Sequence, residues 1–313
     1  MKKFFVFLVF VFVIILSLSI ASCTNNPLSE PGGAKPAYPY SELVSVPGGT
    51  FTQTDETGTN SFSHTISAFK MGKYEVTYDL WYMVKTWALS NGYSFANAGM
   101  EGYDGVRLSG AAPTAAKYQP VTTVSWRDVI VWCNAYSEKS GFTPCYTYAS
   151  AVIKDSTNGL ACDAAVCDWT QTGYRLPSEG EWQYAASYKD GSSWQPYNYA
   201  SGATADYTDA AATGLVAWYT TNSGSVTHDD GGKNANMLGI YDMSGNVLEW
   251  CWDRDKTYPG TSTNYRGPST GSSRVIRGGY FDCGVSPLQV GYRYYYFPSG
   301  PYRAIGFRLA RST

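Results

Sequence analysis

Histidine and closely spaced cysteines are nearly absent from this sequence of 313 residues. It holds two histidines, His64 and His228, which stand far apart, and it has no C-x2-C pair. The usual structural zinc site is therefore excluded, because it needs closely spaced Cys and His ligands. The G-x-S-x-G, P-loop, H-E-x-x-H and dinucleotide-binding motifs are absent too, so nothing indicates the enzyme classes that they mark.

Charged residues are also scarce. They make up 15% of the chain, with a formal net charge of −2. Binding to nucleic acid usually needs a clustered basic stripe, which the sequence lacks, so we expect no nucleic-acid partner. Aromatic residues are abundant instead, with 27 tyrosines. Such rings supply contact area in binding loops at low entropic cost, although a tyrosine-rich core would give the same composition.

The longest apolar stretch lies at residues 4–18, directly after Lys2 and Lys3. This arrangement is typical of a secretory signal peptide, and the stretch is shorter than the roughly 20 residues that span a bilayer. Ile-Ala-Ser-Cys at residues 20–23 resembles a bacterial lipobox. We predict that residues 1–22 are removed, that Cys23 is lipidated, and that the protein is exported to the outer membrane and exposed on the surface. The alternative is an ordinary signal peptide beside an incidental cysteine.

Residues 24–40 are polar and rich in proline and glycine. Such a composition cannot bury enough apolar surface to fold. We therefore interpret residues 23–40 as a flexible tether between the membrane and one domain, residues 41–313, within which the composition does not change again. We expect this domain to be a monomer.

Six cysteines remain besides Cys23. In an oxidising compartment they permit up to three disulfides. Cys162 and Cys167 are close enough in sequence to bridge a small loop. The others that lie in apolar segments could instead be buried free thiols, namely Cys133, Cys145 and Cys251.

Helix signals are few. Ser125 begins a capping box before an apolar run that Gly141 ends, Ser178 precedes a second helix with Glu181 three residues on, and a third opens near Thr77. Short strand-like runs lie between clusters of Gly, Asn, Asp and Pro, at residues 67–71, 274–277 and 306–309. The sequence therefore predicts an α+β domain that is rich in coil.

Several segments, in order, resemble the sulfatase-modifying-factor family to which the formylglycine-generating enzymes belong. They are VPGGTF (46–51), MGKYEVT (71–77), PVTTVSW (120–126), GYRLPSEGEW (173–182), GIYDMSGNVLEW (239–250), RVIRGGYF (274–281) and IGFRLAR (305–311). The resemblance covers residues 44–311. It implies a C-type lectin fold of the formylglycine-generating-enzyme type, with few helices and short antiparallel strands.

The resemblance also implies one calcium site. The residues at the matching positions are Asp242, Gly245, Val247 and Glu249. Two carboxylates and two backbone carbonyls offer the oxygen ligands that a hard cation prefers. Alternatively, Asp242 and Glu249 could pair with nearby arginines or cap turns without any ion.

The family's oxidase chemistry uses two cysteines that bind copper, because soft thiolates select Cu(I). Cys283 matches the first of them, and Leu288 replaces the second. Tyr280 stands at the position of the active-site serine, and Leu248 replaces a family tryptophan. Related iron-dependent members need a histidine triad that this chain lacks. We expect neither copper nor iron, and we favour binding over catalysis, with a formylglycine-generating-type oxidase that acts on a protein cysteine as the alternative.

The segment 280–304 fits no family pattern although it lies between two family motifs. It contains no Lys, Glu, Met or Trp and a single Gln, and these five amino acids are the ones that NNY codons do not encode. The organisation resembles the variable proteins of diversity-generating retroelements, in which template adenines are randomised. That resemblance implies a surface receptor or adhesin with a diversified binding site.

The resemblance gives no catalytic residue and assigns the ligand surface to the window 280–304. We predict that the surface is drawn from Phe281, Asp282, Cys283, Val285, Pro287, Leu288, Tyr294, Tyr296, Phe297 and Tyr302, because Tyr and Phe rings are common interface anchors. The expected partner is a protein or other macromolecule at the cell surface. The alternative is a strand-and-loop segment whose tyrosines pack in the core.

Overall fold

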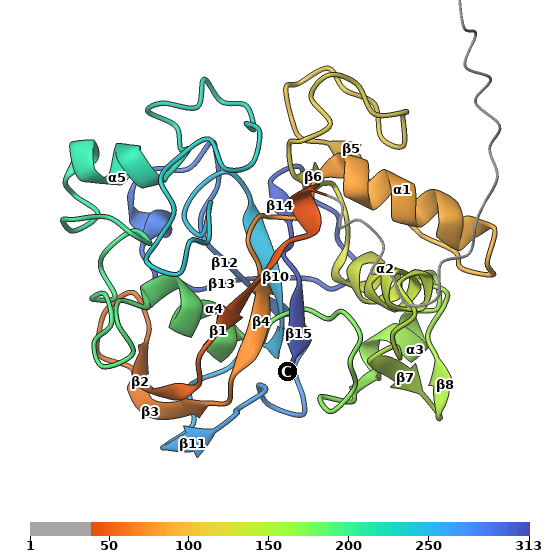
Figure 1. Cartoon of the computed structure of the whole chain (residues 1–313), viewed down its shortest axis with the longest axis horizontal. Helices are drawn as coiled ribbons and strands as arrows, with labels where there is room; N and C mark the ends of the chain where they lie inside the picture. Colours follow the sequence, from red (N-terminus) through yellow and green to blue (C-terminus); the bar gives the residue numbers. More distant parts are fainter. Residues whose placement is uncertain (1–38) are drawn as a thin grey trace, which may run out of the picture. The chain divides into compact units, whose positions relative to one another are not determined.

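The computed structural model describes residues 39–313 (Figure 1). The predicted signal peptide, the lipidation site Cys23 and most of the predicted tether lie outside the described residues. Within the described part, no helix is long and apolar enough to cross a membrane.

The helices are short, and the five α-helices begin at capped residues. They are η1 (Pro39–Ser41), α1 (Tyr78–Leu89), α2 (Trp126–Lys139), α3 (Gly159–Asp163), α4 (Glu179–Ser187), α5 (Ala210–Val216) and η2 (Ser286–Leu288). The three predicted helices are confirmed as α1, α2 and α4. Thr77 caps α1, and Ser125 and Ser178 open complete capping boxes at α2 and α4. Each cap satisfies backbone N–H groups that a helix start leaves unpaired.

The strands are short and belong to several small sheets. They are β1 (Leu43–Val46), β2 (Gly49–Thr54), β3 (Ser61–Ile66), β4 (Phe69–Gly72), β5 (Met100–Glu101), β6 (Val121–Thr122), β7 (Tyr146–Tyr148), β8 (Ala151–Val152), β9 (Val166–Cys167), β10 (Leu248–Arg254), β11 (Ser262–Thr263), β12 (Arg274–Arg277), β13 (Tyr294–Tyr296), β14 (Ile305–Gly306) and β15 (Ala310–Ser312). The prediction of an α+β domain rich in coil is confirmed.

One strand prediction was wrong. Residues 307–309 lie between β14 and β15 and form no regular strand. The carbonyls of Phe307 and Leu309 instead accept hydrogen bonds from the N–H groups of Val76 and Gly72. Local sequence cannot reveal these partners, because they lie more than two hundred residues earlier in the chain.

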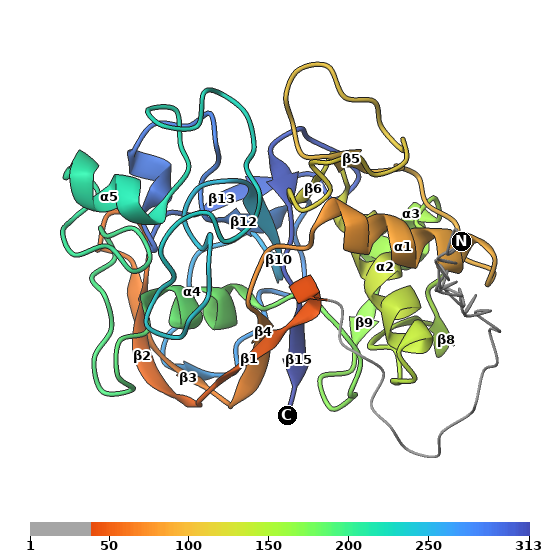
Figure 2. The same cartoon turned by 45° about the horizontal axis from the view of Figure 1, so that its top comes forward.

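The four-stranded sheet has the strand order β13-β12-β10-β14. β10 and β12 are antiparallel, β12 and β13 are antiparallel, and β10 and β14 are parallel. The helices α1 and α2 lie to one side of β10 and α4 lies to the other (Figures 1 and 2). Trp81 of α1 stacks on Trp132 of α2, with ring centroids 5.7 Å apart. The hydrophobic core therefore fills the space on both sides of β10.

All six described cysteines are buried and free. The bridge that the spacing of Cys162 and Cys167 would allow does not form. The thiol of Cys162 points to the carbonyl of Asp155 at 3.5 Å, whereas Cys167 lies in β9 opposite Tyr146. Cys133, Cys145 and Cys251 are buried free thiols, which is one of the two outcomes that the sequence left open.

Candidate functional site

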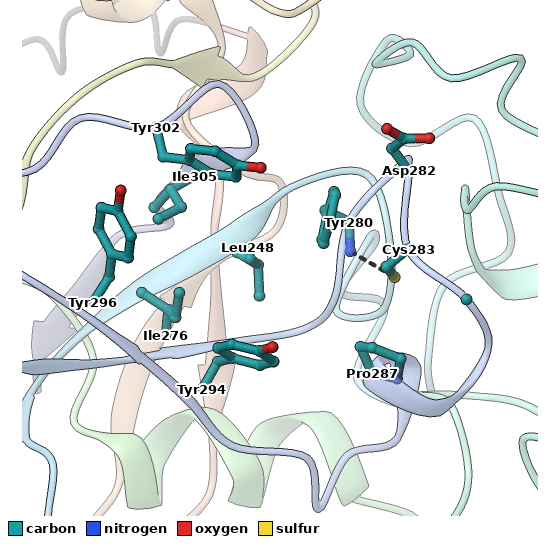
Figure 3. Close-up of a pocket in the computed structure, with 11 residues that line it drawn as sticks. Leu248, Ile276, Tyr280, Asp282, Cys283, Pro287, Tyr294, Tyr296, Tyr302 and Ile305 are labelled. Atoms are coloured by element: carbon teal, nitrogen blue, oxygen red, sulfur yellow. Dashed lines mark hydrogen bonds between the residues drawn. The ribbon is translucent and has the colours of Figure 1, made fainter.

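A cavity of about 540 Å³ opens on one face of the sheet β13-β12-β10-β14 (Figure 3). Its floor takes residues from every strand of that sheet: Ile305 from β14, Leu248 from β10, Ile276 from β12, and Tyr294 and Tyr296 from β13. Leu248 pairs with Ile305, and Ile276 pairs with Tyr294 in the ladders. The strand register therefore builds an apolar and aromatic floor, which we call the aromatic pocket.

The walls of the aromatic pocket come from the segments that leave β12 and enter β14. Tyr280, Cys283 and Pro287 lie on one side and Tyr302 lies on another, with Asp282 at the rim (Figure 3). All five belong to the window 280–304. A ligand in this pocket would therefore contact mainly side chains of the window, which also supplies Tyr294 and Tyr296 to a floor that the scaffold completes with Leu248, Ile276 and Ile305.

The one carboxylate at the rim is already neutralised. Asp282 forms an ion pair with Arg303 at 3.1 Å and accepts hydrogen bonds from the hydroxyl groups of Thr220 and Ser225. Arg303 also lies over the ring of Tyr103, with the guanidinium carbon 4.4 Å from the ring centroid. The pocket consequently offers rings and hydroxyl groups rather than net charge.

Cys283 is poorly suited to bind copper. Its side chain is buried and its sulfur accepts the N–H of Tyr280 at 3.2 Å. Burial raises the pKa of this thiol to about 11, so it is protonated near neutral pH, whereas the thiolate is the metal ligand. Leu288, at the position of the family's second cysteine, is also fully buried. The donor set therefore does not fit a two-sulfur copper site.

The structure places the ten predicted ligand residues in three groups. Six line the aromatic pocket: Asp282, Cys283, Pro287, Tyr294, Tyr296 and Tyr302. Val285 and Phe297 lie outside its lining. Phe281 and Leu288 have no exposed surface, which corrects their assignment to the ligand surface. Phe and Leu are among the residue types that are most often fully buried in folded proteins.

Sequence reasoning missed five lining residues. Tyr280 and Gly284 belong to the window itself, so they could have been included. Leu248, Ile276 and Ile305 lie on strands that are far apart in the sequence, and only the strand order brings them together.

The backbone of the window is held by groups outside it. Arg277, fully buried, donates hydrogen bonds to the carbonyls of Val290, Gly291 and Tyr292. The hydroxyl groups of Ser244 and Ser223 donate to the carbonyls of Leu288 and Phe281, respectively. Three backbone N–H groups also donate to window carbonyls: Thr123 to Tyr302, Arg127 to Pro298, and Thr220 to Cys283. All of these acceptors are backbone carbonyls of the window.

A second candidate site is a buried carboxylate cluster formed by Glu75, Asp230 and Asp242. Their ligand atoms lie within 4.8 Å of one another. One oxygen of Asp230 (Oδ2) and one of Asp242 (Oδ1) are buried without a hydrogen-bond partner. Asp242 has a positive φ of 55°, a strained conformation that is common at functional sites. The carboxylate cluster could hold a metal ion.

This cluster includes one of the two carboxylates that were predicted as calcium ligands. Asp242 belongs to it, but both oxygens of Glu249 accept hydrogen bonds from the buried Arg308, and Oε2 also accepts one from Trp182. Glu249 thus follows the alternative of pairing with an arginine. Glu75 was missed, although it stands in the quoted motif MGKYEVT, because its neighbours in sequence gave no sign that it faces Asp242.

Side chains offset only part of the negative charge in the carboxylate cluster, through the charges of Arg308 and Lys233. Burial raises the pKa of Glu75 and of Asp230 well above their ordinary values, and it raises the pKa of Asp242 to about 6. The nearest guanidinium, Arg308, is already paired with Glu249 at 2.6 Å. Either protons or a bound cation must therefore compensate these carboxylates.

A further buried aspartate predicts how stability changes with pH. Asp253 accepts the N–H of Glu179 at 2.7 Å, and burial, reinforced by the charge of Glu179, raises its pKa from 3.8 to about 7. The folded chain therefore holds this proton more tightly than the unfolded chain. The resulting stability is complete below about pH 4 and is lost as the pH rises through 7.

We expect Asp253→Asn to raise the free energy of unfolding at pH 8.5 by about 2–4 kcal/mol relative to the unmodified chain. The amide is neutral at all these pH values and can still accept the Glu179 N–H. Urea unfolding between pH 5 and pH 8.5 measures the effect. The exposed Asp229→Asn serves as the control and should keep the original slope; equal slopes for all three proteins would show that Asp253 is not protonated in the folded chain.

Comparison with known proteins gives consistent matches along the chain. A family model described as the sulfatase-modifying factor enzyme 1-like domain matches residues 30–313. The chaperone protein LppX of Paenibacillus barcinonensis is 31% identical over 296 residues, which cover 87% of this chain and 89% of that protein. The formylglycine-generating enzyme of Thermomonospora curvata is 33% identical over 133 residues, or 38% of this chain and 42% of that protein.

Among solved structures, the Treponema denticola variable protein 1 superposes with a TM-score of 0.69 and 29% identity. The match covers 87% of this chain and 95% of that chain.

Proposed function

Because the chain belongs to the family of sulfatase-modifying factor enzyme 1-like domains, we propose that it is a surface-displayed binding lipoprotein with a diversified ligand site. The C-type lectin fold of the formylglycine-generating-enzyme type is confirmed by the family match and by the similarity to the Treponema variable protein. The ligand would be a protein or another macromolecule that inserts a side chain or loop into the aromatic pocket. Lipidation of Cys23 would hold the domain at the membrane.

One observation carries the proposal: the window contributes most of the pocket walls, yet many of the hydrogen bonds that hold the window go to its backbone. A carbonyl or N–H group is present whatever the side chain, so the bonds from Arg277, Ser244 and Ser223 do not depend on the window's sequence. Side chains that face the pocket can then vary while the fold is retained. The likeness to a protein named for its variability supports the same interpretation.

The identity of the pocket residues suits recognition of a macromolecule. Four tyrosines line the cavity, and Tyr294 is 49% exposed. Tyrosine rings are rigid, present an apolar face and a polar tip, and are enriched among the residues that dominate binding energy. A neutral aromatic pocket therefore favours an apolar or aromatic anchor on the partner over a strongly charged one.

Sequencing the 3′ end of the gene and its neighbourhood in several isolates tests the diversified site. We expect substitutions in the codons for residues 280–304, opposite adenines of a nearby near-copy beside a reverse-transcriptase gene. Within the window, codons for pocket-lining residues such as Tyr294 and Tyr296 should change, whereas those for Phe281 and Leu288 should keep apolar residues. An invariant window without a template copy would rule out diversification.

We further propose that the ion of the carboxylate cluster is Ca²⁺, since three carboxylates offer only oxygen ligands. A cation that binds the folded chain alone stabilises it by about 2.7 kcal/mol at one hundred times its dissociation constant. Adding Ca²⁺ to chelator-treated protein should therefore raise the melting temperature, and Asp230→Asn should abolish most of that rise. The neighbouring, exposed Asp229→Asn should respond like the unmodified chain. If Ca²⁺ did not change the melting temperature, bound protons rather than a cation would compensate the charge of the carboxylates.

A further inference from the structure

A second, polar cavity lies where β10 ends and β12 begins, and it shares no lining residue with the aromatic pocket. Its volume is about 280 Å³. Three arginines line it, Arg254 at the end of β10, Arg274 at the start of β12, and Arg266 in the connection between these strands. We call this cavity the arginine pocket.

Arg254 and Arg274 stand directly opposite each other in the β10–β12 ladder. Like charges at directly opposite positions destabilise a strand pair. Arg274 is also 98% buried, since its exposed fraction is 2%. A sequence that keeps two cations here needs a compensating interaction.

Aromatic rings supply part of that compensation for Arg274. Its guanidinium carbon lies 3.6 Å from the ring centroid of Trp126 and 5.1 Å from that of Trp252, and one terminal nitrogen donates to the Trp252 carbonyl at 2.6 Å. The Nε, however, is buried without any hydrogen-bond acceptor. Buried donors of charged groups rarely stay unpaired, so this nitrogen indicates a missing acceptor in the pocket.

Carboxylates do not balance the positive charge. Within residues 39–313, neither Arg254 nor Arg274 forms an ion pair, and Arg254 donates only to the backbone carbonyls of Gly271 and Asp163. Arg266 lies 3.5 Å from Glu181, but that carboxylate is already bound by Arg175 at 2.7 Å. The pocket therefore has surplus positive charge.

The single acidic side chain at the pocket does not change this balance. Asp163 is held by Arg127, which donates from Nε and from a terminal nitrogen at 2.9 and 2.6 Å. Burial, together with the charge of Arg254, lowers the pKa of Arg274 to about 9, although the charges of Asp163 and Asp253 act in the opposite direction.

We propose that the arginine pocket binds a tetrahedral oxyanion, namely phosphate or the phosphate group of a monoester. Planar guanidinium groups donate paired hydrogen bonds that match phosphate oxygens, and several oxygens on one centre allow more than one arginine to bind at once. The volume is several times the ~30 Å³ of a water molecule in the liquid, so the anion fits with room for an ester group. The site is separate from the diversified pocket and does not depend on its role.

Isothermal titration of the full chain in mild detergent with inorganic phosphate, at constant ionic strength, tests this site. We expect binding of one phosphate per chain and a dissociation constant that Arg254→Gln raises roughly tenfold or more, since one set of charge-assisted hydrogen bonds is lost. Arg254 is only partly buried, so this variant should fold. Arg311→Gln is the matched control, because Arg311, like Arg254, is partly buried and donates to a backbone carbonyl but lies outside the pocket; this variant should bind phosphate normally.

Two further ligands complete the test. Acetate at the same ionic strength should bind far more weakly than phosphate, because it has one carboxylate and a single charge. Glycerol 3-phosphate should compete with phosphate; stronger binding of the ester would assign the natural ligand to a phosphate ester, and stronger binding of the free ion would assign it to phosphate itself. The proposal fails if phosphate does not bind, or if Arg254→Gln and Arg311→Gln bind it equally well.

Discussion

Replacing Arg277 by methionine is expected to lower the free energy of unfolding by about 4 kcal/mol or more. The methionine would leave the carbonyls of Val290, Gly291 and Tyr292 without the donors that hold them. Buried acceptors that lose their partner carry the full cost of desolvation. Urea unfolding measures the loss, and amide hydrogen exchange should show faster opening of the window than of α2.

The variant Arg277→Lys distinguishes the effect of the hydrogen bonds to the three carbonyls, which we call the backbone clamp, from the effect of the positive charge. Lysine keeps the positive charge beside Glu179, which lies 3.9 Å from Arg277, but a single ammonium cannot reach three carbonyls in the planar geometry of a guanidinium. We therefore expect the lysine variant to lose most of the same stability. If it were as stable as the unmodified chain, the charge rather than the backbone clamp would be what the fold requires.

The second large effect distinguishes two aromatic residues of the window. Phe281→Ala should cost about 3–5 kcal/mol, as for other buried Phe residues, because the ring has no exposed surface and stacks on Tyr103 with centroids 5.4 Å apart. Tyr294→Ala should cost about 1 kcal/mol or less, since that side chain is 49% exposed and loses mainly its stacking on Tyr292. Thermal unfolding of both variants measures the contrast.

The two variants also test which window residues stabilise the fold and which bind the ligand. Tyr294→Ala should weaken ligand capture while the domain stays folded, and Phe281→Leu should restore much of the stability that Phe281→Ala loses, because leucine refills part of the cavity. A large loss of stability on changing Tyr294 would instead mean that the tyrosines of β13 belong to the core, which is the alternative that the sequence left open.

Much of the fold could be predicted because its signals are local. The capping boxes at Ser125 and Ser178 involve residues three positions apart, so the sequence alone places the starts of α2 and α4. The strand at Arg274–Arg277 has a similarly local signal. The family motifs occur in order along the chain and predicted its membership, and the unusual composition of residues 280–304 singled out the segment that walls the aromatic pocket.

The errors came from residues in coil or in elements of only a few residues. Phe281 and Leu288 were assigned to the ligand surface together with Tyr294, yet they are buried. A long helix or strand has a period that tells which side chains share a face, whereas the segment 281–288, which is coil except for the three residues of η2, has none. The pairing of Cys162 with Cys167 could not be decided from the sequence either, because spacing in sequence does not give the direction of two side chains.

The sequence by itself determined the family, the α+β class, the capped helices and the location of the window, since each depends on neighbouring residues or on their order. The tertiary structure alone decided the membership of each site. Glu75 lies beside Asp242 in the carboxylate cluster, and Glu249 pairs with Arg308. Leu248, Ile276 and Ile305 lie in the floor of the aromatic pocket, and Arg254 lies opposite Arg274. These contacts link residues that are far apart in the chain, and their formation depends on strand register and burial, which no local pattern of side chains encodes.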